Sequence, residues 1–274
     1  SSADLQLDVY ALFADSRDRV WVGAANSVPG YLPVRRLAAP RMTATAFADS
    51  QADHPIRLAA TFAEDRAGTV WVGCSQGVVL RETRSSESAP AVLERISVSP
   101  QLPDASAVAL AFEARGRLWI GSEGVFVADP APGQPLRPRR VLPELDNTRV
   151  NCIVEGLQGR LFFGTERGVY RFDETSSELQ HYTRADGLPG NDISHCVRDA
   201  GGDLWFASPV GVARFARDNE DGAPQPQVRV SELSVDGLPF PMAPLGSVNP
   251  TPLRLDAGSH RIGITLLAVL HASG

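Results

Sequence analysis

The sequence lacks lysine altogether, and all 26 basic side chains among its 274 residues are arginine. Together with 32 acidic residues they give a formal net charge of −6. The largest basic cluster, Arg137, Arg139 and Arg140, lies beside prolines, as expected of a solvated loop. Proteins that bind nucleic acid or anionic membranes usually concentrate basic charge on one surface. We therefore expect neither of them as a partner of this chain.

Long apolar segments are also missing. No stretch reaches the ~20 apolar residues of a membrane span, and the opening SSADLQLDVY lacks the basic and apolar regions of a secretory signal. We predict no membrane insertion by this chain, and if the parent protein is exported, this chain is a processed piece of it. The 24 glycines, the 21 prolines and the absence of amphipathic runs of helical length predict almost no helix.

Motifs that carry catalysis are absent as well. No G-x-S-x-G motif occurs, and the segment from Asp218 to Gly222 lacks the ligand alternation of a calcium loop. The histidines do not fall at metal-ligand spacing with one another or with the cysteines. They are His54, His181, His195, His260 and His271. We predict no catalytic residue, no metal site and no cofactor.

The chain does contain one short sequence motif that occurs five times. Its core reads V-W-V-G, V-W-V-G, L-W-I-G, L-F-F-G and L-W-F-A, and the central aromatic residues are Trp21, Trp71, Trp119, Phe162 and Trp205. The steps between these aromatics are 50, 48, 43 and 43 residues. A period of this length is typical of the four-stranded blades of a β-propeller.

A turn signal accompanies each core. An acidic residue stands six positions before the aromatic in four units, and a glycine stands three positions before it in four units. The acids are Asp15, Asp65, Glu113 and Asp199, with Gly156 as the exception; the glycines are Gly68, Gly116, Gly159 and Gly202, with Asp18 as the exception. This spacing predicts a hairpin turn in which the carboxylate accepts turn amides and the later residue takes a positive φ.

Each unit is thus predicted to hold a first strand, a tight turn, a second strand with the aromatic, a short turn, a third strand and a variable fourth strand. In the fourth unit these strands are VNCIVE, RLFFGT, GVYRFD and ELQHYT. Their imperfect alternation fits sheets that are covered on both faces by neighbouring blades. We interpret the five aromatics as wedges, that is, as large side chains packed between adjacent blades. The predicted fold class is all-β, a propeller of four-stranded blades.

The chain has three cysteines, Cys74, Cys152 and Cys196. This small and odd number does not indicate a disulfide framework. When Phe162 is aligned with Trp205, Cys152 falls opposite His195 rather than Cys196. On alternating strands the two cysteines should then point to opposite faces. We therefore predict buried free thiols and no bridge between them.

The character of the sequence changes after Phe215. The segment ARDNEDGAPQPQ has the composition of a linker. Beyond it, VRVSELSVDGLPF and PLRLDAGSHRIGITLLAVL read as strands, with turns at Asp236-Gly237 and around residues 256–259. We divide the chain into propeller repeats at 1–217, a linker at 218–227 and the beginning of a C-terminal β-sandwich at 228–274.

The segment from His181 to Phe215, HYTRADGLPGNDISHCVRDAGGDLWFASPVGVARF, closely resembles the two-component regulator propeller repeat. That family's pattern runs from a D-G-L-P-x-N loop through an acidic-x-x-G turn to L-W-x-G-T and G-L-x-R-F. The resemblance covers residues 56–215; the first unit departs from it after Gly23, and the fifth has Ala207 for the usual glycine. The tail from Val228 resembles the opening of a Y_Y_Y β-sandwich domain.

The resemblance implies the periplasmic sensor region of a hybrid histidine kinase or diguanylate cyclase. It also implies a larger ring than five blades, so that this chain would be part of a longer sensor. Alternatively, the N-terminal residues could supply the outer strand that the fifth unit lacks. We expect open blade edges, or the sandwich, to support a homo-oligomer.

Strand order places the turns between second and third strands, and the connections between blades, on one end of the propeller. Polar loops that converge on a rigid scaffold are common ligand sites. The candidate ligand-binding residues at this end are Asn26, Gln76, Glu123, Glu166, Arg167, Asn191 and Asp192. We expect a small molecule or a saccharide as the ligand of a non-catalytic sensor. The alternative function is a propeller enzyme of the lyase or lactonase type, with its active site on the funnel face.

Overall fold

The computed structural model describes residues 8–25, 31–38, 43–48, 56–83, 92–98, 100, 102, 108–131, 133–216, 227–241, 258 and 261–269. These residues contain no α-helix, only strands and four short 3-10 turns. The turns are η1 (Ser75–Gly77), η2 (Pro143–Leu145), η3 (Leu157–Gly159) and η4 (Arg184–Asp186). The chain forms two compact units, Ser1–Arg217 and Asp218–Gly274.

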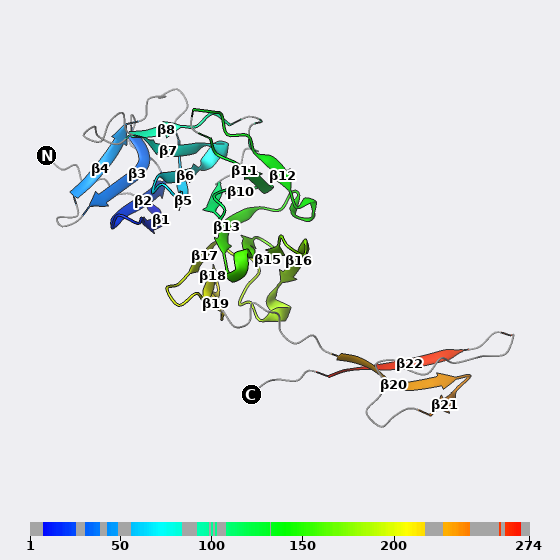
Figure 1. Cartoon of the computed structure of the whole chain (residues 1–274). Helices are drawn as coiled ribbons and strands as arrows, with labels where there is room; N and C mark the ends of the chain where they lie inside the picture. The colour runs from blue at the N-terminus through cyan, green and yellow to red at the C-terminus, as the bar shows by residue number, and fades with distance from the viewer. Residues whose placement is uncertain are drawn as a thin grey trace. The chain divides into compact units, whose positions relative to one another are not determined.

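The first unit is a succession of antiparallel sheets in which each strand pairs with its neighbour in sequence (Figure 1). Blade 1 holds β1 (Asp8–Ala14), β2 (Arg19–Ala25), β3 (Tyr31–Ala38) and β4 (Thr43–Ala48); blade 2 holds β5 (Ala59–Glu64), β6 (Val70–Cys74), β7 (Val79–Thr83) and β8 (Val92–Arg95). Blade 3 holds β9 (Ala109–Phe112), β10 (Leu118–Ser122), β11 (Gly124–Ala128) and β12 (Arg139–Val141).

Blade 4 consists of β13 (Val150–Glu155), β14 (Leu161–Thr165), β15 (Gly168–Asp173) and β16 (Glu178–Tyr182), and blade 5 of β17 (His195–Arg198), β18 (Leu204–Ser208) and β19 (Gly211–Phe215). The predicted all-β fold with four-stranded blades is confirmed. Within the described residues the fifth sheet has three strands. The N-terminal residues that could supply its fourth strand, 1–7, lie outside the described part of the chain.

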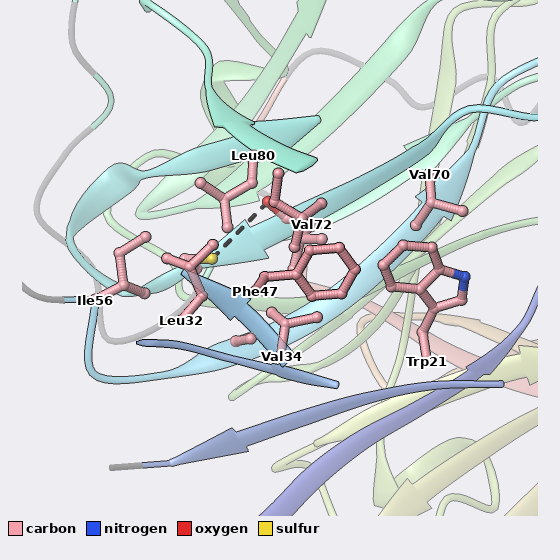
Figure 2. Packing of buried hydrophobic residues seen from close by; sticks show 11 residues of the cluster. Trp21, Leu32, Val34, Phe47, Ile56, Val70, Val72 and Leu80 are labelled. Carbon is pink, nitrogen blue, oxygen red and sulfur yellow. Dashed lines mark hydrogen bonds between the residues drawn. The ribbon is translucent and has the colours of Figure 1, made fainter. Parts of the chain in front are cut away.

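The blades pack in sequence order. The first strands β1, β5, β9, β13 and β17 contact one another in series, and an apolar cluster fills each of the four junctions. Trp21 in the first cluster is fully buried and stacks on Phe47, with ring centroids 5.6 Å apart. Figure 2 shows this cluster, in which Val70, Val72 and Leu80 of blade 2 surround the two rings.

The wedge interpretation is confirmed for four of the five aromatics, which are at most 2% exposed and belong to the cluster shared with the following blade. They are Trp21, Trp71, Trp119 and Phe162. Trp205 differs because it is 37% exposed. Within the described residues no blade follows blade 5, and the Arg214 guanidinium lies over the Trp205 ring, 5.9 Å from its centroid, so a wedge packed between two blades is not observed at this position.

The predicted hairpin turns are present. Asp65 Oδ1 accepts hydrogen bonds from the amides of Ala67 and Thr69, both at 2.9 Å. Asp199 Oδ1 accepts from Gly201 and Asp203 at 2.9 and 3.0 Å. The turn position has a positive φ in all five units, at Asp18, Gly68, Gly116, Gly159 and Gly202.

The turn acid has a second partner that sequence inspection missed. The indole nitrogen of the wedge tryptophan donates a hydrogen bond to the carboxylate in each of the four units that have both groups. The donor–acceptor distances are 2.7 Å for Trp21 and Asp15, 3.1 Å for Trp71 and Asp65, 3.2 Å for Trp119 and Glu113, and 2.8 Å for Trp205 and Asp199. The fourth unit, with Phe162 and Gly156, lacks donor and acceptor together.

Ion pairs join two of the junctions, one of them buried and the other partly exposed. Between blades 1 and 2, Arg19 binds Asp15 Oδ2 at 2.6 Å and both carboxylate oxygens of Glu82 at 2.8 and 2.9 Å. Burial alone would raise the pKa of Asp15, but hydrogen bonds from Trp21, Arg19 and Arg17 outweigh it and hold this pKa below its ordinary value.

At the third junction, Arg117 connects Glu113 of its own turn to Glu174 of blade 4, at 2.8 and 2.6 Å from the two Glu174 oxygens. Hydrogen bonds from Arg117 lower the pKa of Glu174 despite its partial burial. Charged groups therefore hold junctions that the repeat pattern alone suggests are apolar.

The connections that enter blades 3, 4 and 5 each contribute one leucine to the core. They are Leu102, Leu145 and Leu188, which lie eleven residues before Glu113, Gly156 and Asp199, and all three are at most 6% exposed. In the D-G-L-P loop, Thr183 caps η4 and exchanges hydrogen bonds with Asp186, while Gly187 has a φ of 104°. The loop thereby directs Leu188 into the cluster between blades 4 and 5.

The prediction for two of the cysteines is wrong: Cys152 and Cys196 form a disulfide, with Cα atoms 5.8 Å apart. The alignment placed them on opposite faces of equivalent strands. Because blades stack, the faces that meet at a junction are opposite ones, so Cys152 on β13 and Cys196 on β17 point toward each other. Cys74 is buried and lies outside the disulfide, as predicted.

The second unit contains a three-stranded sheet in the order β21-β20-β22. Its strands are β20 (Gln227–Val235), β21 (Leu238–Phe240) and β22 (Ile262–Val269). The predicted hairpin at Asp236-Gly237 is present, with φ values of 53° and 82°. These values are those of the left-handed turn that favours aspartate and glycine between paired strands.

Candidate ligand-binding face

One end of the propeller-like unit gathers the connections that sequence analysis singled out. The turns between second and third strands lie beside the connections that enter their own blade and the next one. The amide of Gly124 donates to the carbonyl of Thr148 at 3.0 Å, and the amide of Glu166 donates to the carbonyl of Arg149 at 3.3 Å. The acid-containing hairpin turns lie at the other ends of the same strands. We call the first end the top face.

Arg149 lies between three of the predicted residues on this face. Its Nη2 is 3.7 Å from a carboxylate oxygen of Glu166 and 3.7 Å from one of Asp192. Its backbone forms an isolated β-bridge with Glu123. The side chains of Arg149, Glu166 and Asp192 are 40%, 34% and 56% exposed, so all three are open to solvent.

Arg167 is exposed beside this cluster. Its amide is fixed by the hydroxyl of Thr165 at 3.0 Å, and its carbonyl oxygen lies 2.9 Å from His181 Nε2. The His181 ring stacks on Tyr170, with centroids 4.0 Å apart and planes within 7°. These contacts hold the backbone of the turn that carries the exposed Arg167 side chain.

The other candidates are not gathered at Arg149. Asn191 serves the loop itself, because its Oδ1 accepts the amide of Arg184 at 2.9 Å. Gln76 is exposed on η1 in blade 2, with a φ of 63°. Asn26 lies outside the described residues. The predicted set thus divides into Glu123, Glu166, Arg167 and Asp192 near Arg149, and three residues elsewhere.

Sequence analysis missed Arg149 itself. The signal was available, because Arg149 stands seven residues before Gly156 and Asp192 stands seven residues before Asp199. The two residues therefore occupy the same position in successive blades. The sequence does not show that these two equivalent residues lie close together. Their proximity follows from the packing of each turn against the connection that enters the next blade.

The cluster contains hydrogen-bonding groups of both charges, a guanidinium that donates and two carboxylates that accept. At 3.7 Å the guanidinium and each carboxylate form ion pairs without a direct hydrogen bond, so a hydroxyl or amide of a third molecule at their exposed edge can hydrogen-bond to both groups. Among the described residues, no group of three His, Cys, Asp or Glu side chains is suitably placed for a metal ion. The arrangement suits a polar, uncharged or zwitterionic ligand.

No protein-family model matches the sequence, and no curated protein matches it. Solved structures do match. The extracellular domain of BT4673 from B. thetaiotaomicron, described as a hybrid two-component system, superposes with a TM-score of 0.60 at 18% identity, over 84% of this chain and 29% of that one. The first unit is a β-propeller. Its successive four-stranded antiparallel sheets match those of propeller structures.

Two further matches illustrate the range of proteins with this fold. The extracellular domain of BT3049 from B. thetaiotaomicron, also described as a hybrid two-component system, gives a TM-score of 0.56 at 18% identity over 86% of this chain and 38% of that one. Virginiamycin B lyase from Staphylococcus aureus gives 0.57 at 12% identity, over 77% and 68%. This chain spans less than a third of the BT4673 structure.

No described helix has the length and hydropathy needed to cross a bilayer.

Proposed function

We propose that this chain is the ligand-sensing part of an extracytoplasmic bacterial receptor of the two-component or diguanylate cyclase kind. In this proposal it binds and relays but does not catalyse. The observation that carries the proposal is the convergence of Glu166 and Asp192 on Arg149 at the top face of the propeller. The repeated residues of the five units, by contrast, are occupied by turn formation and blade packing.

A saccharide or another polyhydroxylated small molecule fits this cluster best. Carboxylates accept hydrogen bonds from sugar hydroxyls, and guanidinium groups donate to sugar oxygens. The nearby stack of Tyr170 and His181 supports the turn that presents Arg167. Binding at this face would bring together connections from blades 3, 4 and 5.

An oxidising compartment accords with the Cys152–Cys196 disulfide, since such bonds persist in the periplasm and outside the cell and are rare in the cytosol. The fold likeness to extracellular domains described as parts of two-component systems supports the same location. We assign residues 228–274 to the opening of a Y_Y_Y-like sandwich that passes the ligand-induced change onward. A ligand shifts such an equilibrium only if it binds one arrangement more tightly.

The second candidate is a propeller lyase, favoured by the likeness to virginiamycin B lyase, of which this chain covers 68%. A lyase needs a base placed to remove a proton from its substrate. Conversion of virginiamycin B by the purified chain, followed by mass spectrometry, would establish this activity. We expect no conversion.

Thermal unfolding in the presence of xylohexaose, maltohexaose and chitotriose tests the sensor proposal. A ligand that binds only the folded chain raises the unfolding temperature in a concentration-dependent manner. We expect at least one of these probes to do so. If none of the three stabilises the chain, a saccharide ligand at the top face is contradicted.

A further inference from the structure

The connection that enters blade 5 is attached to blade 4 beside the candidate site. Asn151 Nδ2 donates a hydrogen bond to the carbonyl oxygen of Ile193 at 2.8 Å, and the amide of Ile193 donates to the carbonyl oxygen of Thr165 at 2.9 Å. Asn151 occupies the bulge of β13, where the pairing with β14 is interrupted. Asp192 directly precedes Ile193, so these contacts fix the backbone that carries its carboxylate.

The Cys152–Cys196 disulfide is the covalent part of this attachment. Cys152 stands three residues after Arg149, and Cys196 stands four residues after Asp192. Arg149 and Asp192 form an ion pair at 3.7 Å on the top face. The bond thus links the two backbone segments that carry opposite sides of the candidate site.

Another junction shows that a hydrogen bond can take the place of this covalent bond. Thr61 occupies the position of Cys152 in blade 2, since each residue pairs with the glycine two positions after the wedge. The Thr61 hydroxyl donates to the carbonyl oxygen of Val108, in the connection that enters blade 3, at 2.6 Å. A noncovalent contact therefore suffices to join neighbouring blades at this position, and the disulfide is available for a second role.

We propose that the disulfide is a redox-sensitive clamp on the candidate site. In the oxidised chain the clamp holds Asp192 beside Arg149. A cross-link removes conformational freedom from any opened arrangement, so its loss favours opening. In the reduced chain the connection keeps only the hydrogen bonds of Ile193 and its packing, and it opens locally while the blades stay folded. The site then loses one of its two carboxylates.

Reduction requires an external dithiol and proceeds by thiol–disulfide exchange. A thiolate of the dithiol attacks one sulfur of the bond, a mixed disulfide forms, and the other cysteine leaves as a thiolate that takes up a proton. The second thiol of the dithiol then displaces the remaining cysteine. Two electrons and two protons pass to the chain, and the dithiol becomes a disulfide. Re-oxidation of the two thiols by a disulfide of the same class closes the clamp again.

The effect on binding rests on the proposed function, whereas the opening of the connection does not. Hydrogen–deuterium exchange, without any ligand, compares the oxidised chain with the chain reduced by dithiothreitol. The amide of Ile193, followed in fragments that cover 188–196, should exchange about tenfold faster or more after reduction. Fragments that cover β6 should not change.

Two variants control this measurement. Cys152→Ser/Cys196→Ser should exchange like the reduced chain with and without dithiothreitol. Cys74→Ala keeps the disulfide and should respond to dithiothreitol like the wild type. Far-UV circular dichroism checks that each chain is folded, and Cys152→Ala/Cys196→Ala replaces the serine variant if that one is not.

Calorimetric titration of both forms with xylohexaose and maltohexaose measures binding. We expect the reduced chain to bind about tenfold more weakly or less, because only molecules with a closed connection bind. The proposal is overturned by unchanged exchange at Ile193, by faster exchange throughout blades 4 and 5, by equal affinity of the two forms, or by a disulfide that dithiothreitol reduces only in unfolded chains. Absence of binding to both forms contradicts the proposed function instead, and the exchange result then decides whether the clamp exists.

Discussion

At the scale of single residues, the turn acid performs two tasks at once. In the first, second and fifth units one carboxylate oxygen accepts turn amides and the other accepts the indole N–H of the wedge. A buried indole needs such an acceptor, because an unpaired donor costs about 1–3 kcal/mol. The fourth unit replaces acid and tryptophan together, by Gly156 and Phe162, and so leaves no donor without an acceptor.

The same residues yield a comparison of two tryptophans. Trp71→Ala should lower the free energy of unfolding by ~3–5 kcal/mol, because it removes a large buried side chain between two blades. Trp205→Ala should cost much less in the monomer, since its ring is 37% exposed. Denaturant titrations of both variants at low protein concentration provide the measurement. Equal losses, or a loss below ~1 kcal/mol for Trp71→Ala, would show that the wedge assignment is incorrect.

At the scale of elements, the four junctions between blades share one geometry but are stabilised by different kinds of interaction. Arg19 and Glu82 form a buried ion pair at the first, and Trp71 meets Phe112 edge-on at the second, with centroids 5.7 Å apart. Arg117 and Glu174 pair at the third. The fourth has the Cys152–Cys196 disulfide. The shared pattern specifies the shape of a blade, and each junction adds its own partners.

Reduction of the disulfide gives a prediction for the fourth junction. The bond joins residues 44 positions apart, so its loss should lower the free energy of unfolding by ~4 kcal/mol. Denaturant unfolding with and without a phosphine reductant measures this. A Cys152→Ser/Cys196→Ser variant is the control and should not respond to the reductant. Unchanged stability of the wild type, with two more thiols titrated, would contradict the prediction.

What repeats in the sequence could be predicted, because it reflects local geometry. The turns at Asp65 and Asp199 and the strands around each aromatic are of this kind. Contacts between blades could not be predicted from the repeat. Arg19 and Glu82, for example, are 63 residues apart, and their pairing is not part of the repeated pattern. The disulfide was missed because cysteines on opposite faces of equivalent strands were expected to point apart. In adjacent blades those opposite faces meet at the junction. Arg149 was missed although it repeats the position of Asp192.

At the scale of the whole molecule, the propeller places rigid blades beneath loops that carry the polar groups. Glu123, Glu166, Arg167 and Asp192 come from turns and connections of three successive blades, with Arg149 among them. The distances between these groups depend on how neighbouring blades pack. In our account it binds a ligand at the top face and leaves that ligand chemically unchanged.

Calorimetric titration with whichever oligosaccharide most stabilises the chain tests this account most directly. Glu166→Gln/Asp192→Asn should weaken binding about tenfold or more, a loss of ~1.4 kcal/mol, because it removes both carboxylates beside Arg149. Glu178→Gln, at an exposed residue of β16 away from the cluster, is the matched control and should bind like the wild type. The oligosaccharide recovered afterwards should be intact by mass spectrometry. Unchanged affinity in the double variant, or a cleaved oligosaccharide, would contradict the account.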